Sequence, residues 1–196
     1  MTITNYNPQN TDRKNEFLCE VDENDNLIGP VTREECHNET RKPWHRSTHA
    51  YLLDKSGNLY LSQRSFSKDT AAGQWTVSAG GHVKFGSTPK ETISKELEEE
   101  LGINIVLELI DKLVIDYGSE REVLYIFAGI TGNKLRFNPN EVNQIKLFDF
   151  DVVVNDFISG RFDLSGGSRD TFKHILKTGT LAKFRQKILL RSSKVQ

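Results

Sequence analysis

Short runs of apolar residues separated by turn sequences predict a chain built from β-hairpins with a few helices. The runs at 51–53 and 59–61 flank Asp54-Lys55-Ser56-Gly57, which is typical of a hairpin. Two strands are expected within 16–30, on either side of a polar turn. Further strands are expected at 75–79, 103–117, 123–130 and 144–148. Hairpins mixed with helices favour an α+β fold or an α/β/α sandwich.

One predicted helix, Pro89–Leu101, has well-defined ends. Thr88 followed by Glu91 forms a capping box, in which side chain and backbone satisfy each other at the first turn. Pro89 suits the first helical position, and Gly102 suits the left-handed conformation that ends many helices.

The other segments are polar or basic. Residues 1–15 are rich in Asn, Thr and Gln and are expected to form a flexible arm, and 32–42 should cross the surface. A helix at 151–158 and a Gly-rich loop at 161–168 precede a basic amphipathic helix or pair of helices. That basic face is interpreted as solvated, with a lid over an anionic substrate as the alternative. Because no linker interrupts 16–196, we predict one domain with a C-terminal helical segment.

Composition narrows the classes of function. Of 196 residues, 36% are hydrophobic and 27% charged, and the net charge of -1 does not favour nucleic acid as a partner. No apolar run approaches the roughly 18 residues that a membrane span needs, so no membrane partner is expected. Cys19 and Cys36 lack a CxxC spacing and no signal peptide is recognisable, so a cytoplasmic location is expected. Trp44 and Trp75 are expected to pack in the core rather than stack on a nucleobase. A homodimer stays open as the assembly.

The predicted helix carries three glutamates on one edge. On a helical wheel advancing about 100° per residue, an apolar stripe at 93, 97 and 101 lies beside an arc of carboxylates without a lysine among them: Glu96, Glu99 and Glu100. Like charges at this spacing repel by a few tenths of a kcal/mol each, and a bound cation would reverse that penalty. Carboxylate oxygens suit Mg²⁺ or Mn²⁺. A solvated acidic face is the alternative, but Gly80 and Gly81 would let a phosphate approach closely.

The stretch 81–103 resembles the Nudix box, whose pattern is G, five residues, E, seven residues, R-E-U-x-E-E-x-G-U, where U is apolar. The positions that match in register are Gly81, Glu96, Leu97, Glu99, Glu100, Gly102 and Ile103. Ser87 stands where the family has Glu, and Lys95 where it has Arg. The resemblance implies a Nudix-type α/β/α sandwich with a mixed β-sheet. It also implies that Glu96, Glu99 and Glu100 bind the metal ion.

Outside the box, the chain from 16 to about 150 resembles the branch of the superfamily that includes isopentenyl diphosphate isomerase. Three histidines match metal ligands of that branch, and two glutamates match its paired-glutamate strand: His37, His45, His82, Glu120 and Glu122. The resemblance implies that His37, His45, His82 and Glu120 also bind metal. It further implies that Arg64, Lys68 and Gly81 contact the substrate diphosphate. Histidines that merely pack or lie on the surface are the alternative.

Residue 80 is a position at which this chain differs from the isomerase of this superfamily. The isomerase carries a cysteine at this position, and glycine has no side chain that can move a proton on an alkene. The resemblance therefore implies metal-dependent hydrolysis of a diphosphate linkage in a small organic diphosphate, nucleoside or isoprenoid-like. An isopentenyl diphosphate isomerase and a non-catalytic diphosphate-binding module are the alternatives. The catalytic candidates are Glu99 and Glu100, with Glu120, Glu122 or Glu141 as the general base.

Overall fold

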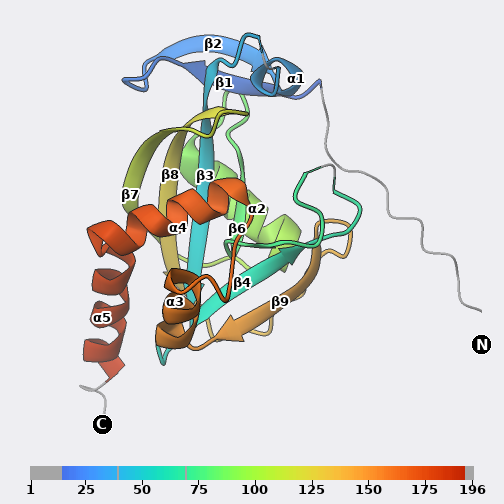
Figure 1. Ribbon diagram of the computed structural model, residues 1–196. Helices are drawn as coiled ribbons and strands as arrows, with labels where there is room; N and C mark the ends of the chain where they lie inside the picture. The colour runs from blue at the N-terminus through green and yellow to red at the C-terminus, as the bar shows by residue number, and fades with distance from the viewer. Residues whose placement is uncertain (1–14, 39, 69, 193–196) are drawn as a thin grey trace, which may run out of the picture.

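The computed structural model describes residues 15–38, 40–68 and 70–192 (Figure 1). Its strands are β1 Phe17–Val21, β2 Leu27–Thr32, β3 Trp44–Leu53, β4 Leu59–Arg64, β5 Trp75–Thr76, β6 Ala79–His82, β7 Leu107–Asp116, β8 Arg121–Ile130 and β9 Val142–Phe148. Its helices are α1 Arg33–Cys36, α2 Pro89–Leu101, α3 Phe150–Ile158, α4 Gly166–Thr178 and α5 Thr180–Ser192.

Strand β3 organises the sheet because it pairs with β1, β4, β6 and β8. It runs parallel to β8 along its whole length, from Trp44 opposite Arg121 to Leu53 opposite Ile130. The other pairings in the described part of the chain are antiparallel, with β7 beyond β8 and both β5 and β9 against β4. The sheet is therefore mixed, as predicted.

Alternate residues of β3 face two separate hydrophobic cores. Tyr51 and Leu53 pack in a core shared with α3, α4 and α5. Ala50 and Leu52 pack in a second core with α2. Because successive strand residues point to opposite faces, helices cover both sides of the sheet. Figure 1 shows α2 behind the sheet and α3 to α5 in front, which confirms the α/β/α sandwich.

Helix α2 confirms its predicted ends. Thr88 and Glu91 form both hydrogen bonds of the capping box, and Gly102 adopts the left-handed conformation at φ 65°. The three apolar residues of its predicted stripe, at 93, 97 and 101, are fully buried. This burial fixes the rotation of the helix, and with it the direction in which its glutamates point.

Elsewhere the elements differ in detail from the prediction. The strand expected at 75–79 divides into β5 and β6, because the chain changes partner from β4 to β3 there. Ser78 bridges those partners: its hydroxyl donates to the Tyr60 carbonyl and accepts from the Leu52 amide. The surface segment 32–42 contains the short helix α1, which begins at a second capping box, Thr32 with Glu35.

The C-terminal segment is a pair of helices that separate at Gly179, where φ is 69°. Phe172, Ile175, Phe184 and Ile188 are buried, which confirms the amphipathic pattern, whereas Leu189 and Leu190 of α5 are exposed. Trp75 packs against Phe148 and Phe162, as expected of a core residue. Within the described ranges, no helix is both long and apolar enough to cross a membrane. Residues 1–14 of the predicted arm lie outside the described residues.

Candidate active site

The glutamates of α2 line one wall of a cleft. Glu96 and Glu100 are half-buried, whereas the Glu99 side chain is 54% exposed. Glu96 lies directly against Gly81 of β6, where an added Cβ would come within 2.6 Å of its Oε1 atom. One detail of the wheel is wrong, because Lys95 Nζ lies 3.4 Å from Glu99 Oε1, so a lysine does reach the acidic edge. Gly81 therefore makes room for a carboxylate in the cleft.

Two cations and a further carboxylate lie across from α2. Glu141 precedes β9 and forms an ion pair with the Lys68 ammonium group. The Glu141 carbonyl accepts a hydrogen bond of 2.9 Å from the Ser65 amide, which ties this loop to the end of β4. Arg64 is held by the Thr70 carbonyl at 3.0 Å and also lines the cleft. Arg64 and Lys68 thus line the same cleft as the acidic helix. That they hold a diphosphate stays a prediction.

The crowded carboxylates raise one another's pKa values. Burial, followed by the charges of Glu99 and Glu141, raises the pKa of Glu96 to about 7. Burial, followed by the charges of Glu96 and Glu141, raises the pKa of Glu100 well above its usual range. The nearby Lys68 and Arg64 do not cancel this repulsion. A divalent cation would, since it favours the ionised form of every carboxylate around it.

A second cluster combines histidines and glutamates, and the sheet register brings it together. His45 of β3 lies opposite Glu122 of β8, and Ser47 of β3 lies opposite His82 of β6. His45 Nε2 is 3.7 Å from Glu120 Oε2 and 3.8 Å from Glu122 Oε1. His82 Nε2 is 3.3 Å and 3.5 Å from the same two oxygens. One ligand atom from each of these four residues falls within 4.8 Å of all the others.

This second cluster fits a metal ion. Metal–nitrogen bonds of about 2.1 Å place neighbouring ligands about 3.0–3.4 Å apart, close to the observed separations. The Pro43 carbonyl accepts from His45 Nδ1 at 3.3 Å, so the lone pair of Nε2 points into the cluster. The Nε2 atoms of His37 and His45 are buried without a hydrogen-bond partner among the described residues. His37 Nε2 lies 3.5 Å from Glu120 Oε2, at the edge of the group.

In this cluster, the opposite charges of His82 and Glu120 stabilise each other's ionised form and shift their pKa values. Burial opposes ionisation of His82, but the hydrogen bonds that His82 donates to Glu120 and Glu122 outweigh it and raise the pKa of His82 to about 9. Burial likewise works against ionised Glu120, yet His45 and His82 hold its pKa below the usual range. Burial lowers the pKa of His37. Burial also works against ionised Glu122, yet the hydrogen bond that it accepts from His82 helps to hold its pKa below the usual value. Glu120 and Glu122 are therefore ionised and available as ligands at neutral pH.

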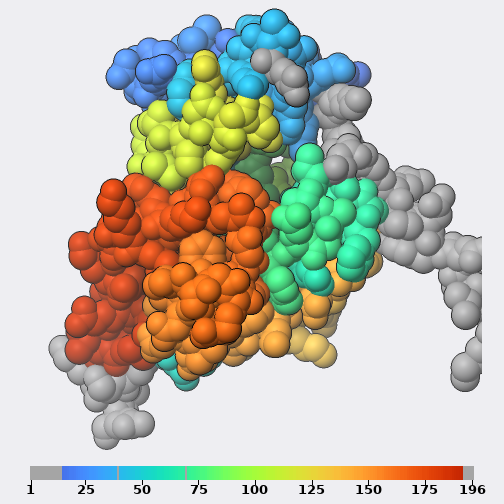
Figure 2. All heavy atoms as spheres, viewed as in Figure 1, coloured from blue at the N-terminus to red at the C-terminus, as the bar shows by residue number. Residues whose placement is uncertain are grey.

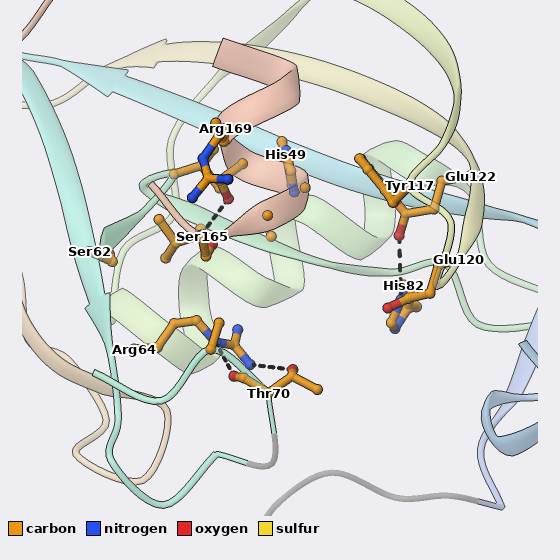
Figure 3. A pocket seen from close by; sticks show the side chains of 18 of the residues that line it. His49, Ser62, Arg64, Thr70, His82, Tyr117, Glu120, Glu122, Ser165 and Arg169 are labelled. Atoms are coloured by element: carbon orange, nitrogen blue, oxygen red, sulfur yellow. Dashed lines mark hydrogen bonds and ion pairs between the residues drawn. The ribbon is translucent and has the colours of Figure 1, made fainter. Parts of the chain in front are cut away.

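The two clusters open into one cleft. A cavity of about 520 Å³ lies over α2 and the strand β6, and a second of about 570 Å³ extends from it toward the start of α4. Both are lined by Arg64, His82, Glu100, Glu122 and Glu141. Figure 2 shows this face hollowed where α4, the loop after β4 and the turn between β7 and β8 meet. In Figure 3, Arg64 and Thr70 lie across the cavity from His82 and Glu120.

Sequence reasoning missed two contributors to the cleft, His49 and Tyr117. His49 of β3 lines both cavities, and its ring fills the space beside Gly80, where an added Cβ would lie 2.8 Å from His49 Cδ2. Tyr117 lines the larger cavity. The first residues of α4 line it too, including Arg169 of the basic segment for which a lid over the substrate is the alternative expectation. Only the pairing of His49 with Gly80 across β3 and β6 reveals its position, and no local pattern predicts that pairing.

The fold and site define a class: an α/β/α protein that gathers carboxylates and imidazoles around a polar cleft. The NUDIX domain family matches residues 43–164. The chain therefore belongs to the Nudix family, whose fold uses a divalent metal ion.

Similar proteins include some named as Nudix hydrolases and others named as isopentenyl-diphosphate isomerases. The chain is 30% identical over 142 residues to an uncharacterised Nudix hydrolase of Pseudomonas aeruginosa, covering 72% of this chain and 83% of that protein. It is 33% identical over 170 residues to an isopentenyl-diphosphate Delta-isomerase of Corynebacterium diphtheriae, covering 81% and 92%.

Solved structures confirm the fold. The crystal structure of DR0079 from Deinococcus radiodurans superposes with a TM-score of 0.68 at 22% identity, covering 81% of this chain and 98% of that one. A MutT protein from Methanosarcina mazei gives 0.59 at 20% identity, covering 70% and 96%.

Proposed function

We propose that this protein hydrolyses the phosphoanhydride bond of a small organic diphosphate in a reaction that requires Mg²⁺ or Mn²⁺. The observation that carries the proposal is the wall of Glu96, Glu99 and Glu100 on α2, facing Arg64 and Lys68 across one cleft. Acidic groups on one side hold cations, and basic groups on the other hold phosphate oxygens. When bound, a divalent ion supplies positive charge that polarises the diphosphate and acidifies water.

The residues of the chain have separate roles in this reaction. Arg64 and Lys68 orient the diphosphate, and Gly81 keeps the floor of the cleft free of a side chain. Glu141 accepts the proton of the attacking water, since its carboxylate belongs to the same group as Glu96 and Glu100. The oxygen of that water forms a bond to phosphorus while the bridging P–O bond breaks, which releases a phosphate and an organic monophosphate.

The His–Glu cluster supports a second ion beside the first. Two imidazoles and two carboxylates suit Mn²⁺ or a transition metal better than Mg²⁺. In this proposal Glu122 is a metal ligand as well as an alternative base.

Isomerisation of isopentenyl diphosphate is the second candidate, favoured by the His–Glu cluster and by the names of several relatives. Against it, Gly80 offers no acid or base, and the His49 ring fills the space beside it. Incubation with isopentenyl diphosphate in deuterated water tests this activity. Deuterium in the recovered substrate or its allylic isomer would establish isomerisation, and its absence alongside phosphate release would exclude it.

The test of hydrolysis is phosphate release from nucleoside diphosphates, sugar-linked diphosphates and isoprenoid diphosphates, with Mg²⁺ or Mn²⁺ and added pyrophosphatase. Glu99→Gln should lower kcat at least about 100-fold, as loss of a charged group that stabilises the transition state does. Glu98→Gln is the matched control, because Glu98 is also exposed on α2 but lies outside the cleft. Equal turnover in the two variants would exclude the proposed role of the acidic wall.

A further inference from the structure

The larger cavity, of about 570 Å³, has a polar lining beyond the two carboxylate clusters. It lies between β3, the loop after β4 and the start of α4, and hydroxyl groups recur around it: Ser62, Thr70, Thr76, Tyr117, Ser165 and Ser168. It shares Arg64 and Glu141 with the cavity over α2. A diphosphate between Arg64 and α2 would therefore direct its organic group into this space.

Polar atoms make up the larger part of the surface of this cavity. Its aliphatic lining, among described residues, consists of Ala71, Val77, Ala79 and Val142. A hydrocarbon chain would displace water from polar atoms without burying much apolar surface, which costs free energy. Neither tryptophan lines this cavity, since Trp75 packs its ring 5.1 Å from that of Phe148, and the aromatic rings of the described lining are those of Tyr117 and three histidines. The lining thus favours polar groups over a prenyl chain.

Some polar atoms of lining residues have no hydrogen-bond partner among the described residues, whereas Ser62, Thr76 and Ser168 already hydrogen-bond to other protein groups. Tyr117 Oη and His49 Nδ1 are buried atoms without a hydrogen-bond partner among the described residues. Burial lowers the pKa of His49 to about 4, so the neutral ring offers one donor and one acceptor. Ser165 makes no side-chain cap on α4, so its hydroxyl does not satisfy an amide of the first turn, and Gly166 and Gly167 of that turn line the same cavity. Hydroxyl groups both donate and accept, so they match this wall.

We propose that this cavity, the hydroxyl pocket, binds a polyhydroxylated group, either a sugar or a polyol, that is esterified to the diphosphate. The inference rests on the proposed function, since the diphosphate is what places the organic group. In the hydroxyl pocket, Tyr117, His49 and the start of α4 replace the water molecules that solvate the hydroxyls.

The test compares two five-carbon substrates that differ only in their hydroxyls, ribitol 5-diphosphate and pentyl diphosphate. Phosphate release is measured with Mn²⁺, and kcat/KM for the ribitol compound should exceed that for the pentyl compound about 30-fold or more, the effect of two or more hydrogen bonds. Tyr117→Phe removes one hydroxyl and should lower that ratio about three- to tenfold. Tyr60→Phe, outside both cavities, is the matched control and should leave the ratio unchanged.

The outcomes distinguish failure of the proposed hydroxyl pocket from failure of the proposed hydrolysis. Equal or faster hydrolysis of pentyl diphosphate would refute the binding of a polyhydroxylated group in the pocket but would still support the hydrolase activity. If neither compound releases phosphate, the hydrolase fails for this class, and calorimetric titration with ribitol 5-phosphate and pentyl phosphate decides the pocket. A tenfold or greater preference for ribitol 5-phosphate that shrinks in Tyr117→Phe would support it, at about the strength of one hydrogen bond. No preference would overturn it.

Discussion

Gly81→Ala tests whether the position of the Glu96 carboxylate, rather than its presence, controls turnover. The new Cβ would lie 2.6 Å from Glu96 Oε1 and 2.7 Å from Cδ, closer than unbonded atoms approach. Those atoms end a flexible side chain, so the carboxylate moves and the backbone stays. Ordinary contact begins near about 3.5 Å, so the shift is about 1 Å.

A displacement of that size should lower kcat/KM by up to about 100-fold, because catalytic groups tolerate little misplacement. The free energy of unfolding should change by less than about 1 kcal/mol, since alanine costs less backbone entropy than glycine in a strand. Gly29→Ala in β2 is the control, because its Cβ would meet nothing within 4 Å. Phosphate release with Mn²⁺ and urea denaturation measure the two quantities. Wild-type turnover in a stable Gly81→Ala protein would refute the reasoning.

Three further predictions concern charge. The pKa of Glu96 is raised to about 7, so its stabilising contribution is complete below about pH 4.5 and is lost as pH rises through 7. Without metal, the free energy of unfolding of Glu96→Gln should therefore rise relative to that of wild type by about 1–3 kcal/mol between pH 5 and 8, as measured by urea denaturation. A difference that does not change with pH would contradict this. Mn²⁺ at about 100 times its Kd should stabilise the protein by about 2.7 kcal/mol in thermal melts. Glu122→Gln should shrink that gain, and an equal gain in the variant would argue against the His–Glu site. Asp25→Asn should lower the free energy of unfolding by about 2–4 kcal/mol in urea denaturation, because the buried Asp25 carboxylate holds Arg46 at 2.6 Å. The control Glu23→Gln, at an exposed residue, should leave the free energy of unfolding unchanged.

Local signals predicted the elements whose ends depend on neighbouring residues. Thr88, Glu91 and Gly102 fix α2 because capping hydrogen bonds span only a few residues. The acidic edge of α2 followed from the same helical geometry. The second capping box, Thr32 with Glu35, carried the same signal for α1, and only the shortness of that helix concealed it.

The rest of the site depends on strand pairings that no short pattern encodes. His45 meets Glu122 because β3 runs parallel to β8, a pairing between segments far apart in the chain. Resemblance to a family named both residues but could not give the distances that make them one cluster. The place of His49 in the cleft could not be predicted from its sequence neighbours, because it depends on the pairing of His49 with Gly80.

Two consecutive glycines, Gly80 and Gly81, leave room for two side chains that line the cleft. Gly80 leaves space that the His49 ring fills, and Gly81 leaves space that the Glu96 carboxylate fills. A cysteine at 80 would bring Cβ to 2.8 Å from the Thr48 carbonyl as well, so it requires the backbone of β3 to move. We therefore expect that replacing Gly80 alone by cysteine would strain the pairing of β3 with β6. The same packing places the His49 imidazole and the Glu96 carboxylate on neighbouring parts of the cleft, where we propose that the organic group and the diphosphate of the substrate bind.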